Sequence, residues 1–126
     1  MNNHTRPVHL DLTRMKFPPM AIVSIMHRIS GVLLFLLLPF VLYLLYTSLQ
    51  SQADFEQLRQ FTMASPFVEF LLWILVSAVC FHFLAGVRHM LMDCGLGEGL
   101  HVARVTAYLI ILLEVIAMIF AGVWLW

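Results

Sequence analysis

The chain has 126 residues, of which 62% are hydrophobic and 11% are charged, with a formal net charge of zero and a mean hydropathy of +0.93. Soluble domains carry about 25% charged residues, so this chain has too little polar surface to cover a fold that faces water. The composition therefore excludes an ordinary soluble globular protein and favours a lipid bilayer as the solvent. The balanced charge offers no basis for a nucleic-acid partner.

Apolar stretches along the chain predict three transmembrane helices. A helix of about 20 apolar residues crosses a hydrocarbon core about 30 Å thick. A polar N-terminal segment, a polar first link and a second link with three glycines separate the apolar stretches; we predict a short surface helix in the first link and a loop in the second. The sequence predicts an all-α membrane protein with one membrane-anchor domain, made of N-terminal segment 1–23 and helices 24–50, 66–92 and 104–126.

The basic residues near the span ends predict the orientation of the chain. Cytoplasmic flanks of membrane proteins carry an excess of Lys and Arg. The first link carries only Arg59, whereas the N-terminal side and the second link carry the other basic residues: Arg6, Arg14, Lys16, Arg28, Arg88 and Arg104. We therefore expect a cytoplasmic N-terminus and a periplasmic C-terminus. Neither a secretory signal nor an organelle transit pattern is recognisable at the start, which favours the bacterial inner membrane.

A first polar cluster stands at the start of the first apolar stretch, in the run SIMHRISG at 24–31. On a helix, Ser24 and Arg28 share one face, as do His27 and Gly31. One interpretation is an anchor, with an arginine that reaches to the interface. The other is a site, because a hydroxyl, an imidazole and a guanidinium within five residues exceed what an anchor needs.

A second polar cluster ends the second apolar stretch, in the run HFLAGVRHMLMD. His82, Gly86, His89 and Asp93 follow one stripe of a helix, with Arg88 beside it. Because consecutive spans run in opposite directions, this end of the second span lies at the same membrane edge as the first cluster. His82 is seven residues before His89 and therefore about 10 Å deeper in the membrane.

The deep histidine has two interpretations. A histidine at membrane depth normally faces the interior of the bundle, where His82 could hydrogen-bond a neighbouring helix. It could also bind a metal or a haem, with Gly86 clearing space for the porphyrin face and with His27 and Arg28 as cations for the propionates. Since the remaining histidines of the spans are interfacial, a second axial ligand would come from a partner protein.

Glu114 lies near the middle of the third predicted span. An intramembrane carboxyl is a functional candidate, and the alternative is a protonated carboxyl that hydrogen-bonds another helix. Two further hypotheses stay open from the residues alone. One is a small transporter or proton-conducting subunit that uses His82 and Glu114 as a relay, and the other is a non-catalytic anchor whose polar residues only pack helices.

Together, the two clusters resemble a known family, the cytochrome b556 subunits that form the larger membrane anchor of succinate dehydrogenase (respiratory complex II). The resemblance covers essentially the whole chain, with the three-span layout and the order of the motifs. It rests on Arg-Pro at 6–7, Lys-Phe-Pro at 16–18, Ser-x-x-His-Arg-x-Ser-Gly at 24–31 and His-x-x-x-Gly-x-Arg-His-x-x-x-Asp-x-Gly at 82–95.

The resemblance implies a role for each cluster. It makes His82 one axial ligand of a haem b iron, with the second ligand from the smaller membrane anchor subunit. It places His27 and Arg28 near the haem propionates, and it places Ser24, Ile25 and Arg28 around ubiquinone. The remaining residues of the second motif are expected to support the haem ligand or to dock partner subunits: Arg88, His89 and Asp93. Glu114 receives no role from it.

The resemblance also implies the partners. A flavoprotein subunit would hold FAD and an iron–sulfur subunit would hold the clusters, because this chain has neither a dinucleotide-binding glycine pattern nor a set of cysteines. The expected function is a haem b-containing membrane anchor of succinate:quinone oxidoreductase, without a complete active site of its own. The alternatives are the anchor of a quinol:fumarate reductase and a structural anchor without haem.

Overall fold

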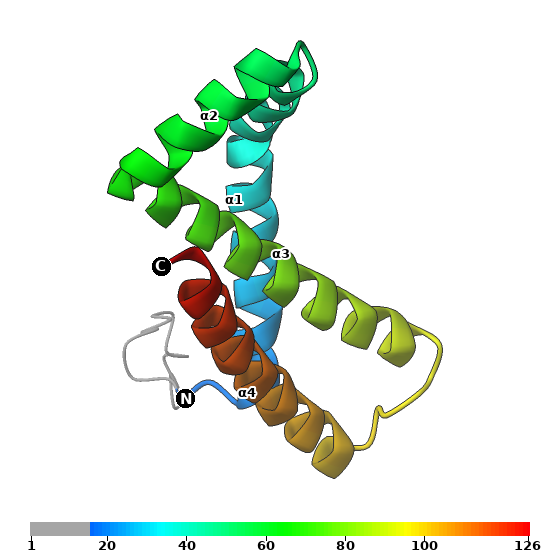
Figure 1. Ribbon diagram of the computed structural model, residues 1–126. Coiled ribbons are helices and arrows are strands. Elements are labelled where there is room, and N and C mark those ends of the chain that lie inside the picture. Colours follow the sequence, from blue (N-terminus) through cyan, green and yellow to red (C-terminus); the bar gives the residue numbers. More distant parts are fainter. Residues whose placement is uncertain (1–15) are drawn as a thin grey trace, which may run out of the picture.

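The computed structural model describes residues 16–126, which fold into α-helices joined by short links (Figure 1). The helices are α1 (Pro19–Ser48), α2 (Gln52–Ala64), α3 (Pro66–Asp93) and α4 (Leu100–Leu125), and the described residues contain no strand. The predicted all-α fold is confirmed. Residues 1–15, with Arg6, Pro7 and most of the predicted N-terminal segment, lie outside the described residues.

Three of the described helices, α1, α3 and α4, are long and apolar enough to cross a membrane. They have 30, 28 and 26 residues, and even the shortest corresponds to about 39 Å of helix at 1.5 Å per residue. Each helix is therefore longer than the hydrocarbon core. The helices α1 and α4 begin at Pro19 and Leu100, a few residues before the predicted spans. The added residues of α1, 19–23, are apolar and begin with the proline that starts the helix, whereas those of α4 include the polar His101.

The ends of these helices follow from local sequence. Pro19 occupies the first position of α1, where a missing N–H costs nothing. At the end of α3, Gly95 has φ of 79°, a left-handed conformation that favours glycine. This turn lets the N–H groups of Gly95 and Leu96 donate to the carbonyls of Met92 and Leu91, each at 2.9 Å. The predicted loop is therefore confirmed, although it is short.

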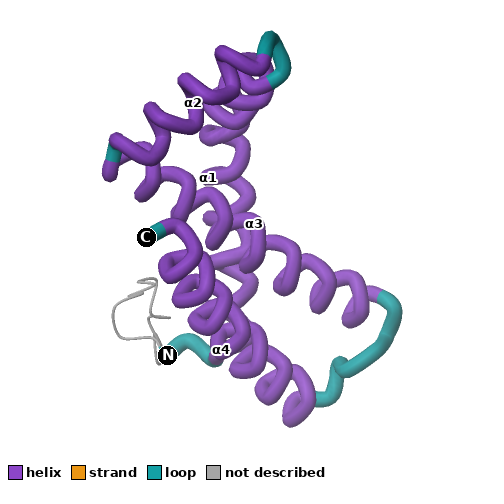
Figure 2. The backbone as a smooth tube through the Cα atoms, viewed as in Figure 1, coloured by secondary structure: helices purple, strands orange, loops and turns teal. Residues whose placement is uncertain are grey.

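The polar first link does form a surface helix, α2, as predicted. Ser51 begins it, because its hydroxyl oxygen accepts a hydrogen bond of 3.1 Å from the Asp54 N–H. None of the α2 residues is buried. Figure 2 shows α2 between two short connections, at the end of the molecule where α1 ends and α3 begins. Among the described helices, α2 is the one that is not long and apolar enough to cross a membrane.

The core forms where α1, α3 and α4 meet. It consists of Val23, Phe81, Ala85, Ala107 and Ile110, of which Val23 and the two alanines are fully buried. Small residues let helix backbones approach closely, which is the usual basis of helix association inside membranes. Most large apolar side chains remain exposed on the outside, and α1 is the spanning helix least covered by its own chain. Lipid or other subunits must cover that surface.

Candidate functional site

Three histidines gather where α1 crosses α3. The rings of His27 and His82 stack with centroids 4.1 Å apart and an interplanar angle of 17°. The ring of His89, two turns further along α3, lies 5.2 Å from that of His27. The predicted meeting of the two polar clusters is therefore present. However, we expected His82 to lie deeper than the other histidines, and the structure instead places His27 in direct contact with it.

A glycine opposite each stacked imidazole makes this contact possible. A Cβ at Gly31 of α1 would lie 3.1 Å from Cε1 of His82, and a Cβ at Gly86 of α3 would lie 3.2 Å from Nε2 of His27. Each helix thus carries a His-x-x-x-Gly unit, and each histidine lies over the glycine of the other helix. We expected Gly86 to clear space for a porphyrin face, but in the structure the His27 ring occupies that space.

Two oxygen atoms of α1 lie close to one nitrogen of the His82 ring. Its Nδ1 lies 3.2 Å from the carbonyl oxygen of His27 and 3.1 Å from the hydroxyl oxygen of Ser30. A carbonyl oxygen can only accept, so the contact with His27 is a hydrogen bond in the tautomer that carries its hydrogen on Nδ1. In a neutral ring of that tautomer, Nε2 has the lone pair with which imidazole binds metals.

Ser30 was absent from our sequence-based set of site residues. It is buried, and its hydroxyl also donates a bond of 2.8 Å to the carbonyl oxygen of His27. The available signal was its spacing of three residues from His27, which places it one turn along α1. Whether Ser30 faces α3 depends on the rotation of α1 about its own axis, and residue spacing alone does not give that rotation.

His27 was expected beside the haem propionates. In the structure its ring is half-buried between the two helices, and its Nε2 atom has no hydrogen-bond partner among the described residues. That atom lies toward Gly86. The backbone carbonyl of His27, rather than its ring, makes the polar contact with His82.

Arg88 joins α3 to α4. It is buried, with 6% of its surface exposed, and it donates hydrogen bonds of 3.1 Å to the Thr106 hydroxyl and 3.0 Å to the Ala103 carbonyl. Its polar contacts in the described part of the chain are therefore with a neighbouring helix of the same chain. Asp93, from the same motif, is exposed at the end of α3.

The residues predicted around a quinone lie on α1. Ser24 is half-buried, whereas Ile25 and Arg28 are exposed. Arg28 borders a shallow hollow of about 370 Å³. The rest of that hollow is apolar and is lined by Ile29, Val32, Leu33 and Leu36. The arrangement combines one cationic group with an apolar groove along the helix.

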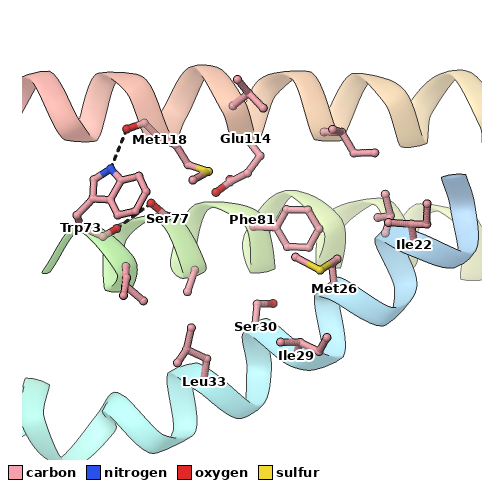
Figure 3. A pocket seen from close by; sticks show the side chains of 15 residues that line it. Ile22, Met26, Ile29, Ser30, Leu33, Trp73, Ser77, Phe81, Glu114 and Met118 are labelled. Atoms are coloured by element: carbon pink, nitrogen blue, oxygen red, sulfur yellow. Dashed lines mark hydrogen bonds between the residues drawn. The ribbon is translucent and has the colours of Figure 1, made fainter. Parts of the chain in front are cut away.

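A larger pocket of about 450 Å³ lies between α1, α3 and α4. Figure 3 shows the Glu114 carboxyl entering this pocket from α4 and the Ser30 hydroxyl entering it from α1. Glu114 is 9% exposed, and its Oε2 atom has no hydrogen-bond partner among the described residues. The hydrogen bond to another helix that we considered for this carboxyl is absent from the described residues. At the wall of this pocket, the indole N–H of Trp73 donates a hydrogen bond of 2.9 Å to the Met118 carbonyl.

The described residues contain no group of three or more His, Cys, Asp and Glu side chains that could hold a metal ion. A metal at this crossing would therefore receive at most two ligands of these types from the described residues and would need the others from elsewhere.

Comparisons with known proteins place the whole chain in one family. The family model for the succinate dehydrogenase/fumarate reductase transmembrane subunit matches residues 2–121. A protein of Coxiella burnetii named succinate dehydrogenase cytochrome b556 subunit is 45% identical over 124 residues, which cover 98% of this chain and 99% of the relative. A protein of Rickettsia typhi with the same name is 25% identical over 111 residues, which cover 88% of this chain and 86% of the relative.

Proposed function

This chain belongs to the family of succinate dehydrogenase/fumarate reductase transmembrane subunits, and from that premise we propose that it is the haem b-containing membrane anchor of a succinate:quinone oxidoreductase. Its relatives are named as cytochrome b556 subunits of succinate dehydrogenase, and a b-type cytochrome carries haem b. Those names favour succinate oxidation over fumarate reduction as the working direction. The chain holds one part of the enzyme rather than a complete active site.

The state of His82 is the observation that carries this proposal. Histidines that bind metals usually donate their other ring N–H to a carbonyl or carboxylate, which orients the ring and raises its basicity. With its hydrogen on Nδ1, His82 donates to the His27 carbonyl in this way, and Nε2 would be the ligand atom. Such a residue fits an axial ligand of haem iron. A bound haem b would accept and pass on single electrons.

The cations of the haem environment come from α1. Haem carries two propionates, and these require positive partners at the same depth. Arg28 is exposed on α1, next in sequence to the residue whose carbonyl holds His82. We assign Arg28, together with the His27 ring, whose Nε2 atom has no partner among the described residues, to the propionate side of the haem.

The same part of α1 supports a quinone site. A quinone needs a hydrogen-bond donor and a cation at its head, and an apolar path for its tail. Ser24 and Arg28 stand one helical turn apart, and Ile25 lies between them in the sequence. The apolar hollow begins at Arg28. Ser24 would donate to a quinone carbonyl, and Arg28 would stabilise the negative charge that develops on reduction.

The partners are inferred from the family to which this chain belongs. The second iron ligand is assigned to the smaller membrane anchor subunit, and FAD and the iron–sulfur clusters are assigned to the flavoprotein and iron–sulfur subunits. His89 and Asp93 stand toward the end of α3. We place that end on the cytoplasmic side of the bacterial inner membrane, where the soluble subunits would attach, and the C-terminus on the periplasmic side.

The haem assignment is tested by changing His82 to leucine in the complete complex and recording the reduced-minus-oxidised optical spectrum. The b-type α band should be lost or shifted, because one axial ligand is missing. A matched control is His101→Leu, since His101 is exposed in the first turn of α4. A spectrum unchanged by both substitutions would reject His82 as the ligand, and a native complex without the band would be a haem-less anchor.

The quinone assignment is tested by changing Arg28 to leucine. Succinate-driven reduction of a soluble dye should continue, because the dye takes electrons before they reach the membrane, whereas quinone reduction should fall. Arg104→Leu serves as the control, since Arg104 is an exposed arginine on α4. If both activities fall together in the Arg28 variant, the residue supports assembly rather than quinone binding.

A further inference from the structure

Ser30 is a buried hydroxyl with two polar neighbours, and both belong to the histidine crossing. It is 6% exposed, and its Oγ lies 2.8 Å from the His27 carbonyl oxygen and 3.1 Å from Nδ1 of His82. The first neighbour is on its own helix, one turn back. The second is on α3, 52 residues away in the sequence.

The His27 carbonyl sets the directions of these hydrogen bonds, because a carbonyl oxygen can only accept. The Ser30 hydroxyl has one hydrogen, and it donates that hydrogen to the His27 carbonyl. Its lone pairs then face His82, whose Nδ1 carries a hydrogen. The Nδ1–H of His82 is therefore shared between two acceptors, the His27 carbonyl at 3.2 Å and the Ser30 hydroxyl at 3.1 Å. Two acceptors restrict rotation of the ring more than one does.

We propose that Ser30 is a positioning residue for the haem ligand, which fixes the plane of the His82 ring and raises the electron density at its Nε2 atom. The proposal rests on the proposed role of His82. A hydrogen bond accepted from the far N–H makes an imidazole a stronger donor to its metal, and such bonds are among the means by which proteins set the potential of haem. Stronger donation stabilises ferric iron, so Ser30 should hold the midpoint potential down.

The bond from Ser30 to its own helix does not by itself indicate a site. Serines inside helices often donate to a carbonyl three or four residues back. Ser77 does so, with a bond of 2.7 Å to the Trp73 carbonyl. Ser77 is also buried at 9% exposure and lines the same pocket as Ser30. The contact with His82 distinguishes Ser30, and Ser77 is therefore its matched control.

The experiment compares Ser30→Ala, Ser30→Thr and Ser77→Ala in the purified complex. The readouts are the haem midpoint potential by redox titration and the low-spin ferric signal by electron paramagnetic resonance. Ser30→Ala should shift the potential to a more positive value and should move or broaden the ferric signal, since the ring has lost one acceptor. Ser77→Ala should leave both unchanged, and threonine, which retains the hydroxyl, should restore them.

Equal potentials and equal ferric signals in Ser30→Ala, Ser77→Ala and the unmodified complex would overturn the proposal. If the alanine variant fails to assemble, the threonine variant and Ser30→Cys decide, because a thiol is a poorer acceptor and should give a positive shift. His82→Leu separates the proposed haem ligand, His82, from the proposed positioning role of Ser30. If that change leaves the haem spectrum intact, the proposed haem ligand fails. If it removes the spectrum while Ser30 and Ser77 variants behave alike, only the positioning role fails.

Discussion

Gly31→Ala is the substitution that tests the histidine crossing most directly. A Cβ at Gly31 would lie 3.1 Å from Cε1 of His82, so the ring must move by a few tenths of an ångström. The ring is held by hydrogen bonds of 3.1 and 3.2 Å, and a shift of that size stretches them toward the length at which they are lost. The strain therefore acts on the proposed iron ligand.

The steric cost of the added methyl group at Gly31 can be isolated by comparison with a second glycine. A Cβ at Gly122 of α4 would lie 3.6 Å from the Trp73 indole nitrogen, which is an ordinary contact. Both substitutions gain about 1 kcal/mol of helix propensity, and this term cancels between them. What remains is the steric term, for which overpacking costs about 1–3 kcal/mol. Gly31→Ala should be less stable than Gly122→Ala by this amount.

The assay is thermal denaturation of the purified complex in mild detergent, followed by the loss of the haem absorbance band, with the haem content measured beforehand. Gly31→Ala should denature at a lower temperature and retain less haem, whereas Gly122→Ala should match or exceed the unmodified complex. If the two alanine variants are equally stable and equally loaded, the close contact between Gly31 and His82 does not exist in solution.

Three further substitutions test the other buried polar groups by thermal denaturation of the complex. Arg88→Ala removes both hydrogen bonds to α4 and leaves a gap, so the free energy of unfolding should fall by about 2–4 kcal/mol. Arg88→Met should lose less stability, because methionine fills the gap without a charge. Equal melting temperatures of the alanine variant and the unmodified complex would contradict this role. Glu114→Leu removes a buried oxygen that has no hydrogen-bond partner among the described residues, so the free energy of unfolding should rise by about 1–3 kcal/mol. The haem potential should stay unchanged. A loss of quinone reduction in this variant would instead show that the carboxyl has a function. Trp73→Phe deletes the bond to the Met118 carbonyl and should cost about 1 kcal/mol, a prediction that unaltered melting would refute.

The spans and the surface helix could be predicted because hydropathy and polarity are local properties. A stretch such as that between Ile29 and Thr47 contains no charged residue and can only be buried or face lipid. The convergence of the two clusters also followed, because spans alternate in direction. The short extensions of α1 and α4 did not follow. The predicted first span began at the polar cluster around Ser24, whereas the helix already includes the apolar run 19–23. At α4, a polar residue such as His101 carries no signal for whether a helix has already begun.

The detailed geometry of the crossing could not be predicted from spacing. Counting residues gives depth only for parallel helices, whereas α1 and α3 cross (Figure 1). Near such a crossing, residues of different nominal depth come together, as His27 and His82 do. The rotation of α1 also decides whether Ser30 or Ser24 faces α3. That rotation is set by packing at Ala85 and Val23, which are apolar residues without a chemical signature.

The contacts between α1 and His82 have a consequence for how tightly the ring could bind a partner. Fixing a side chain costs up to about 2 kcal/mol of conformational entropy. The His82 side chain loses this entropy when the helices of its own chain pack, because the oxygen atoms that contact its ring belong to α1 and not to another subunit. The proposed ligand is therefore preorganised, and a preorganised group binds more tightly because less freedom is lost on binding. Under the proposed function, helix packing within this chain would set the ring geometry that the cofactor and the second subunit must match.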